Sequence, residues 1–286
     1  MAGPQLSQVA LDIRHMDGLL ALSAEAGWNQ VADDWAFMLA NGAGYGFADA
    51  DGRLVASGLT VEFPRYAWIS MILVTPAWRR RGLATRLMKL CAERLASVGL
   101  PAGLDASPQG REVYLKLGFR DCGSTTRLEG ELAGQSVPPM PYGLDVAPMT
   151  TSDIAEVAAL DARSAGTDRT PLLAHLLARM PQAAFVAHRG GCVSGFVLAR
   201  PGRQCAQIGP LVSSDEATAI TLLASAGAAV GGPLCLDLFD ERGSVRRYLD
   251  RCGFRPATTF VRMVSGARDL FPPDHHTMAM AGPELS

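Results

Sequence analysis

Apolar and polar residues in the first half of the chain follow two spacings in turn, one typical of strands and one of amphipathic helices. Strands are predicted over residues 9–14, 45–48, 54–62, 69–74, 102–106 and 125–131, with a further strand from 119, and helices over 17–26, 31–39, 83–92 and 109–117. Strands joined by short turns come before the first crossover helix, which indicates a mixed and mostly antiparallel sheet.

The same order of elements begins again after residues 133–145, a segment rich in Pro and Gly that has no periodicity. Helices are predicted over 152–162, 171–179, 215–230 and 244–252, and strands over 183–188, 193–200, 205–212, 234–238 and 259–264. Residues from 266 onward show no such pattern, and we expect them to form a loose tail.

Two short sequence signatures occur in each half, in the same order. One is Leu-Asp, at residues 104–105 and 236–237; the other begins with Tyr-Leu and ends with Gly-Phe-Arg, at residues 114–120 and 248–255. We therefore interpret the chain as a tandem duplication of one α/β fold of the α+β type. The expected domains are residues 1–132 and 146–266, with a linker over 133–145 and a tail over 267–286.

The most informative segment of the first half runs from Trp68 to Ala92. An apolar strand is bounded by Pro76, a basic loop over residues 79–81 follows, and Gly82 stands just before an amphipathic helix. A short loop leading into a helix start directs free backbone N–H groups and the positive end of the helix dipole at one point. This arrangement binds an anion, most naturally a phosphate. The alternative is a strand, loop and helix with a purely structural role.

The segment resembles the acetyl-CoA loop of the GCN5-related N-acetyltransferases (GNAT), whose pattern is Gln/Arg-x-x-Gly-x-Gly/Ala. It matches that pattern at Arg79, Gly82 and Ala84, whereas the dinucleotide-binding G-x-G-x-x-G and the P-loop G-K-[ST] are absent. The resemblance covers residues 8–131 and implies two acyl-CoA N-acyltransferase folds in tandem. It implies that acetyl-CoA binds to the residues Leu73, Val74, Arg79, Arg80, Arg81, Gly82, Leu83, Ala84 and Thr85.

The same resemblance implies a catalytic acid. Tyr114 lies four residues before the Gly of Gly-Phe, where the family often carries the acid that protonates the departing CoA sulfur; a tyrosine packed under the sheet is the alternative. No base is identified, because Trp68 and its neighbours occupy the strand position where relatives carry a glutamate. Glu62 is the nearest carboxylate candidate; its alternative role is a solvated charge at the end of a strand, and a water relay could replace a base altogether. Trp28 and Trp68 are candidates for the wall of an acceptor pocket, or for core residues.

The second half departs from the pattern where the cofactor would bind. Its equivalent loop contains Asp215 and Glu216 and lacks the glycine, and Leu249 occupies the position of the signature tyrosine. Two carboxylates at a helix start would repel a pyrophosphate. We therefore expect a degenerate second domain that does not catalyse and that shapes the substrate site or forms a dimer.

Composition narrows the possible partners. The net charge of −2 gives no general basic surface, so nucleic acid is not expected as a partner.

Residues 217–236 carry no charge, but Gly231, Gly232 and Pro233 would interrupt a membrane span, and no secretory signal is present. The six cysteines form no CxxC pair, and no metal site is expected; His275 and His276 beside Asp274 are more typical of a solvated tail. We expect a soluble, cytoplasmic protein, possibly a homodimer.

These observations predict an N-acetyltransferase that moves an acetyl group from acetyl-CoA to a primary amine of a small or amino-acid-like molecule. Two alternatives remain open at this stage. One is an acetyltransferase that acts on protein lysines or peptides, and the other is a non-catalytic acetyl-CoA-binding regulatory module.

Overall fold

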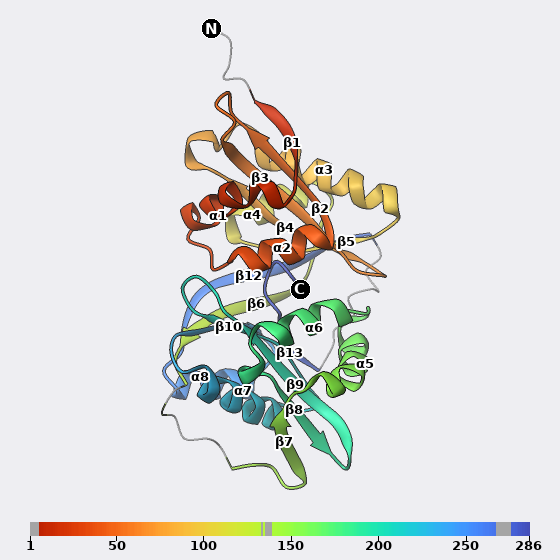
Figure 1. The fold of residues 1–286 in the computed structure, drawn as a ribbon, viewed down its shortest axis with the longest axis vertical. Helices are drawn as coiled ribbons and strands as arrows, with labels where there is room; N and C mark the ends of the chain where they lie inside the picture. Colours follow the sequence, from red (N-terminus) through yellow and green to blue (C-terminus); the bar gives the residue numbers. More distant parts are fainter. Residues whose placement is uncertain (1–5, 133, 135–138, 267–275) are drawn as a thin grey trace.

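The computed structural model describes residues 6–132, 134, 139–266 and 276–286. The strands of both halves form one sheet of 13 strands, in the order β1-β2-β3-β4-β5-β12-β6-β11-β13-β10-β9-β8-β7. Figure 1 shows the first half at one end of this sheet and the second half at the other, each with its helices packed on the strands. The predicted fold class, a mixed and mostly antiparallel sheet flanked by helices, is confirmed.

The first half closely follows the predicted order. Its strands are β1 (Ser7–Leu11), β2 (Gly42–Ala48), β3 (Leu54–Glu62), β4 (Ala67–Val74), β5 (Ala102–Ala106) and β6 (Arg120–Gly130), and its α-helices are α1 (Met16–Glu25), α2 (Ala32–Ala40), α3 (Leu83–Val98) and α4 (Pro108–Lys116). The two strands predicted after residue 119 are therefore a single long strand.

The second half repeats this order. Its strands are β7 (Leu144–Pro148), β8 (Phe185–Arg189), β9 (Cys192–Arg200), β10 (Ala206–Ser213), β11 (Leu234–Phe239) and β12 (Arg255–Ser265), and its α-helices are α5 (Ile154–Ala165), α6 (Thr170–Arg179), α7 (Glu216–Val230) and α8 (Gly243–Arg251). The last two residues of the expected linker, Leu144 and Asp145, belong to β7.

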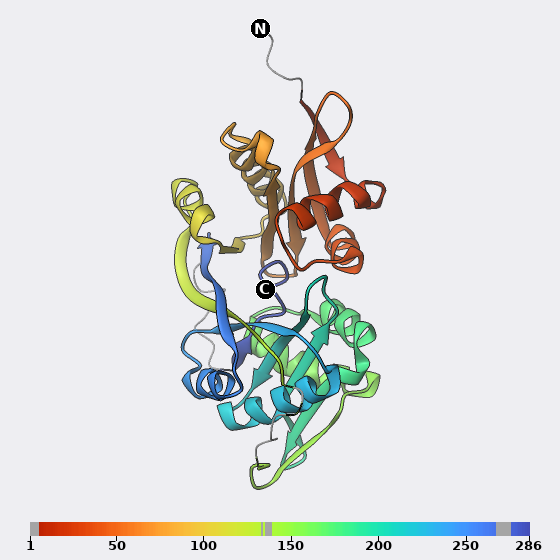
Figure 2. The same ribbon diagram turned by 90° about the vertical axis from the view of Figure 1, so that its left-hand side faces the viewer.

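The two halves exchange their last long strands. β12, from the second half, pairs with β5 of the first half, and β6, from the first half, pairs with β11 of the second. β6 and β12 also pair with each other along most of their length, and both views show them side by side between the halves (Figures 1 and 2). Residues 133–145 therefore separate the two halves along the sequence, but they do not separate the structure into two sheets.

β4 and β5 diverge after a short contact. These parallel strands pair at Ala67 with Ala102 and at Trp68 with Gly103, and at no later position within the described residues. Farther along β4, Met71 has a positive φ of 54° and the register with β3 shifts, as in a β-bulge. The bulge turns β4 away from β5 and opens a gap in the sheet.

The expectation of a loose tail is wrong for its described part. Residues 277–279 form strand β13 inside the sheet, and Met280, Ala281 and Leu285 are buried. The side chain of Trp68 donates a hydrogen bond from Nε1 to the carbonyl of Pro283 at 2.9 Å. The segment stays in place because the sheet offers it backbone partners and the core covers its apolar side chains.

Buried ion pairs join the halves in addition to the shared strands. Asp34 of α2 is fully buried and contacts both Arg179 of α6 and Arg200 of β9, the latter at 2.5 Å. Burial by itself would raise the pKa of Asp34, but the guanidinium groups of Arg200 and Arg179 outweigh it and hold that pKa below its usual value. The largest apolar cluster also contains residues from both halves. The two halves thus share one core.

Candidate functional site

The basic loop before α3 has the geometry of an anion site. Gly82 adopts the left-handed conformation, with φ at 79°, and Arg80 does so at 60°. No side chain caps α3, and no acidic residue lies in its first turn. The first N–H groups of the helix therefore remain available to an anion, and the residues from Arg79 to Gly82 are exposed beside them.

The loop arginines are held on the surface by weak local contacts. Nε of Arg79 donates to the carbonyl of Val74 at 3.1 Å, and the guanidinium of Arg81 lies 4.8 Å from the ring centroid of Trp78. Leu83 is buried beneath the helix and offers a ligand only its backbone, whereas Ala84 and Thr85 are half-exposed. This arrangement brings the sequence-predicted residues 79–85 together.

The end of β4 offers backbone groups to the gap between β4 and β5. The N–H of Thr75 donates to Val55 of β3 at 2.9 Å. Because successive residues of a strand direct their N–H groups to opposite sides, the N–H of Val74 faces away from β3, toward the gap. Leu73, also predicted, is buried and pairs with Ser57 of β3.

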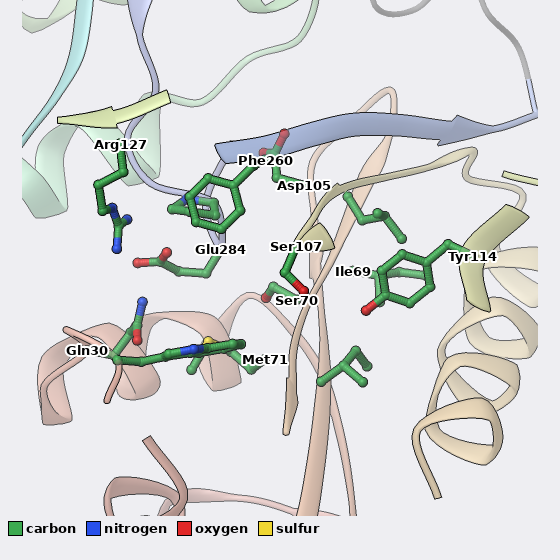
Figure 3. Close-up of a pocket in the computed structure, with 14 residues that line it drawn as sticks. Gln30, Ile69, Ser70, Met71, Asp105, Ser107, Tyr114, Arg127, Phe260 and Glu284 are labelled. Carbon is green, nitrogen blue, oxygen red and sulfur yellow. The ribbon is translucent and has the colours of Figure 1, made fainter. Parts of the chain in front are cut away.

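A pocket of about 110 Å³ opens where β4 and β5 diverge. It is lined by residues of the first half, of the exchanged strands and of the tail: Trp28, Gln30, Ile69, Ser70, Met71, Ile72, Leu104, Asp105, Ser107, Tyr114, Arg127, Phe260, Pro283 and Glu284. Figure 3 shows Tyr114 on one side of this pocket, and Arg127, Gln30 and Glu284 gathered on the opposite side.

Tyr114 directs its hydroxyl into the pocket from α4 (Figure 3). The ring packs against Gly110, where an added Cβ would lie 2.9 Å from the ring and 3.2 Å from the hydroxyl oxygen. Burial raises the pKa of Tyr114 to about 12, so the phenol carries its proton at neutral pH. A protonated hydroxyl in this position can donate a proton to a leaving group in the pocket.

Among the pocket residues that the sequence did not predict, Ser70, Ser107 and Asp105 come from the first half and carry polar side chains. The hydroxyl groups of Ser70 and Ser107 lie between the two ends of the pocket (Figure 3), and Ser107 also caps α4 through the N–H of Gly110. The third, Asp105, is fully buried and pairs with Arg262 of β12. Burial raises the pKa of Asp105 although Arg262 opposes this. The duplicated Leu-Asp signature was the available signal for Asp105.

The other end of the pocket combines distant parts of the sequence. Arg127 of β6 donates from Nε and Nη2 to Asp237 of β11 at 2.9 and 2.8 Å. Glu284 lies in the tail and pairs with Arg200. No local pattern predicts these residues, because strand exchange and tail placement bring them to the site.

Two other predicted site residues lie outside this pocket lining. Glu62 accepts two hydrogen bonds of 2.9 Å from Arg94 of α3, and the structure does not bring it together with Tyr114. Trp68 is fully buried and holds Pro283, so it belongs to the core, whereas Trp28 lines the pocket and is 36% exposed. The catalytic role of Glu62 thus gains no support from this geometry.

The second half has the corresponding gap, but strand β13 fills it. β10 and β11 pair directly at two positions only, and β13 then lies between them and pairs with both. The start of α7 is capped by Asp215 through the N–H of Thr218, and Glu216 accepts hydrogen bonds from the N–H groups of Ser244 and Val245. The N–H of Thr218 at the start of α7 is therefore already engaged, and the carboxylates of Asp215 and Glu216 lie where the pyrophosphate of a cofactor would bind.

Membrane and metal sites find no support in the part of the chain that the structure describes. None of its helices is both long and apolar enough to span a bilayer. No group of three or more His, Cys, Asp or Glu residues there is placed to hold a metal ion. Asp274 and His275 lie outside the described residues.

Known proteins resemble the chain over most of its length. The acetyltransferase (GNAT) domain family matches it twice, over residues 23–133 and 157–279. A holothin acyltransferase from Pseudoalteromonas sp. (strain SANK 73390) is 30% identical over 238 residues, which cover 81% of this chain and 77% of that protein. The uncharacterized N-acetyltransferase YitH from Bacillus subtilis (strain 168) is 24% identical over 250 residues, 86% of each chain.

Solved structures share the fold. A putative acetyltransferase from Pyrococcus horikoshii superposes with a TM-score of 0.76 at 18% identity, covering 100% of this chain and 98% of that one. A tandem GNAT protein from the clavulanic acid biosynthesis pathway superposes with a TM-score of 0.67 at 17% identity, covering 93% and 100%. The two family matches and the 30% identical holothin acyltransferase show that the chain belongs to the GNAT acetyltransferases and is an acyltransferase with two such domains in tandem.

Proposed function

We propose that this acyltransferase moves an acetyl group from acetyl-CoA to a primary amine of a small or amino-acid-like molecule, by direct attack in a ternary complex. The observation that carries the proposal is one run of the chain in the first half. Residues 69–72 of β4 line the pocket that contains Tyr114, residues 73–74 end that strand, and the uncapped start of α3 follows.

Each part of this run of the chain suits one part of the acetyl-CoA donor. The N–H groups at Gly82, Leu83 and Ala84, with the charge of the three arginines, would bind the pyrophosphate. The N–H of Val74, which faces the gap, would donate a hydrogen bond to the pantetheine arm and bring the thioester beside the β4 bulge, whereas the backbone of Leu73 faces β3.

The chemistry then requires one bond to form and one to break. The amine nitrogen forms a bond to the thioester carbonyl carbon, the carbon–sulfur bond breaks, and Tyr114 donates its proton to the departing thiolate. The proton that the amine nitrogen loses passes to water, and Tyr114 regains a proton from water before the next cycle. Holding both reactants in one pocket supplies a large part of the rate enhancement. We assign no side chain as the base, because Glu62 is engaged by Arg94 outside the pocket.

The second half contributes to the acceptor site without a donor site of its own. It supplies Phe260 from β12, and the tail supplies Pro283 and Glu284, while β13 fills its own gap. This supports a substrate-shaping role. The six cysteines form no disulfide, which suits a reducing compartment such as the cytoplasm.

The test is thiol release from acetyl-CoA across a panel of polyamines, amino acids, aminoglycosides and lysine peptides. We expect release that depends on a small amine and that falls sharply in Tyr114→Phe. Release with lysine peptides only would assign the enzyme to proteins. Acetyl-CoA binding that is lost in Gly82→Glu, with no release for any amine, would instead identify a regulatory module.

A further inference from the structure

Two side chains that line the pocket carry a buried polar atom that has no hydrogen-bond partner among the described residues. These atoms are Oε1 of Gln30 and Oε2 of Glu284, and the two residues are only 5% and 3% exposed. Buried polar groups in folded proteins are nearly always paired, so such an atom in a pocket calls for a ligand or an ordered water.

Both unpaired atoms are acceptors, and they lie at the same end of the pocket. Figure 3 shows Gln30 and Glu284 gathered with Arg127, away from the hydroxyl of Tyr114. The positive charge of Arg127 is matched by Asp237 through two hydrogen bonds. A ligand group that satisfies this end must therefore donate hydrogen bonds.

Glu284 is fixed in position by its surroundings. Its Oε1 accepts a hydrogen bond from Arg200, and the preceding carbonyl, that of Pro283, accepts one from Trp68. Because Arg200 also pairs with Asp34, the charge of Glu284 is matched only in part. The free oxygen is thus held in place before any ligand binds.

We propose that Gln30 and Glu284 form a specificity site for a second amino group of the acceptor, remote from the amine that is acylated. An ammonium group has three N–H donors and can therefore serve two acceptors at once, whereas a hydroxyl group has a single donor. The inference rests on the proposed function, because the ligand of this site is taken to be the acceptor of that reaction. The expected acceptor is therefore a diamine or a larger molecule with two separated amino groups.

The test compares binding of linear diamines of three to six carbons with that of the monoamine of the same length, by calorimetry on the full chain. We expect at least one diamine to bind about tenfold or more tighter than its monoamine, the usual effect of a buried hydrogen bond to a charged group. Gln30→Met and Glu284→Gln should each remove this preference. Gln8→Met and Glu156→Gln, at exposed positions far from the pocket, should keep it.

Binding and turnover separate the two proposals. Tyr114→Phe should keep the preference for the diamine and lose turnover. A wild-type protein that binds diamines selectively but releases no CoA would refute only the proposed function. Equal binding of diamine and monoamine at every length, or a preference that survives both pocket variants, would overturn the specificity site. Should Glu284→Gln not fold, Gln30→Met decides, since the side chain of Gln30 makes no described hydrogen bond that it could lose.

Discussion

Arg262 of β12 donates two hydrogen bonds of 3.1 Å to the buried carboxylate of Asp105, its direct neighbour on β5. Arg127 of β6 makes the equivalent pair with Asp237 of β11, again directly across two strands from different halves. The aspartate of each Leu-Asp signature is thus paired with an arginine on the strand received from the other half. These two pairs fix the exchange and lie next to the acceptor pocket.

Arg262→Met should destabilise the protein by about 3–5 kcal/mol, because it leaves Asp105 charged, buried and unpaired. Urea unfolding of the variant measures this loss, and adding Asp105→Asn should restore part of it. Arg246→Met, which removes an exposed pair with Asp250, should cost less than about 1 kcal/mol. A loss of less than about 1 kcal/mol for Arg262→Met would show that the ion pair between Arg262 and Asp105 does not stabilise the pairing of β12 with β5.

Asp34→Asn should also destabilise the protein, and the effect should depend on pH. The pKa of Asp34 is lowered in the folded state, so its carboxylate contributes stability above the unfolded pKa of 3.8, and this contribution is lost as the pH falls through the folded pKa. The difference in unfolding free energy between wild type and Asp34→Asn should therefore shrink between pH 7 and pH 3. Asp33→Asn is the matched control, since the Asp33 side chain is 72% exposed. A difference in unfolding free energy that stays constant between pH 7 and pH 3 would contradict the lowered pKa of Asp34 in the folded state.

Tyr114→Phe should lower kcat by about 100-fold or more while the KM for acetyl-CoA changes little, because the hydroxyl is needed for proton transfer but not for binding. With a pKa of about 12, Tyr114 stays protonated, so its ionisation should not reduce the rate below about pH 11. Steady-state kinetics across pH measure both quantities. Tyr248→Phe alters a buried tyrosine of the second half, one residue before the position that corresponds to Tyr114, and should leave kcat unchanged. Equal losses in kcat and in acetyl-CoA binding would count against an acid role.

Gly82→Glu should weaken acetyl-CoA binding by about tenfold or more, because it adds a negative charge where the helix start and the arginines attract an anion. Gly52→Glu is a close control. Gly52 has the same φ of 79° and the same open surroundings as Gly82, but it lies in the turn between β2 and β3. Calorimetric titration with CoA distinguishes the two, since backbone strain should be common to both variants. Equal weakening by both would mean that strain, and not charge, is responsible.

Glu62→Gln should change kcat by less than about threefold, although the sequence made Glu62 the first carboxylate candidate for the base. Its two oxygens are engaged by Arg94, and it lies outside the residues that line the pocket with Tyr114. Kinetics at saturating amine test this. A hundredfold fall in kcat with an unchanged melting temperature would restore Glu62 as the base.

The sequence alone predicted most of the helices and strands, because their patterns are local, but it placed the start of β7 in the linker. The spacing of apolar residues predicted the observed bounds of β3 and β5, and the order of strand, Pro76, arginines and Gly82 predicted the uncapped start of α3, since each of these depends on neighbours in the chain. Tyr114 followed from its spacing to Gly118-Phe119, and the structure places it in the pocket.

The tertiary structure decided which distant segments meet. β6 and β12 are similar strands, and nothing local shows that each pairs with the fifth strand of the other half. The tail has no helical or strand period of its own. Its residues 277–279 form β13 because the gap between β10 and β11 offers them hydrogen bonds, and this placement brings Glu284 to the pocket. The pairing of strands and the lining of the pocket depend on contacts between residues that are far apart in the sequence. The free energy of these contacts cannot be inferred from a short stretch of neighbouring residues.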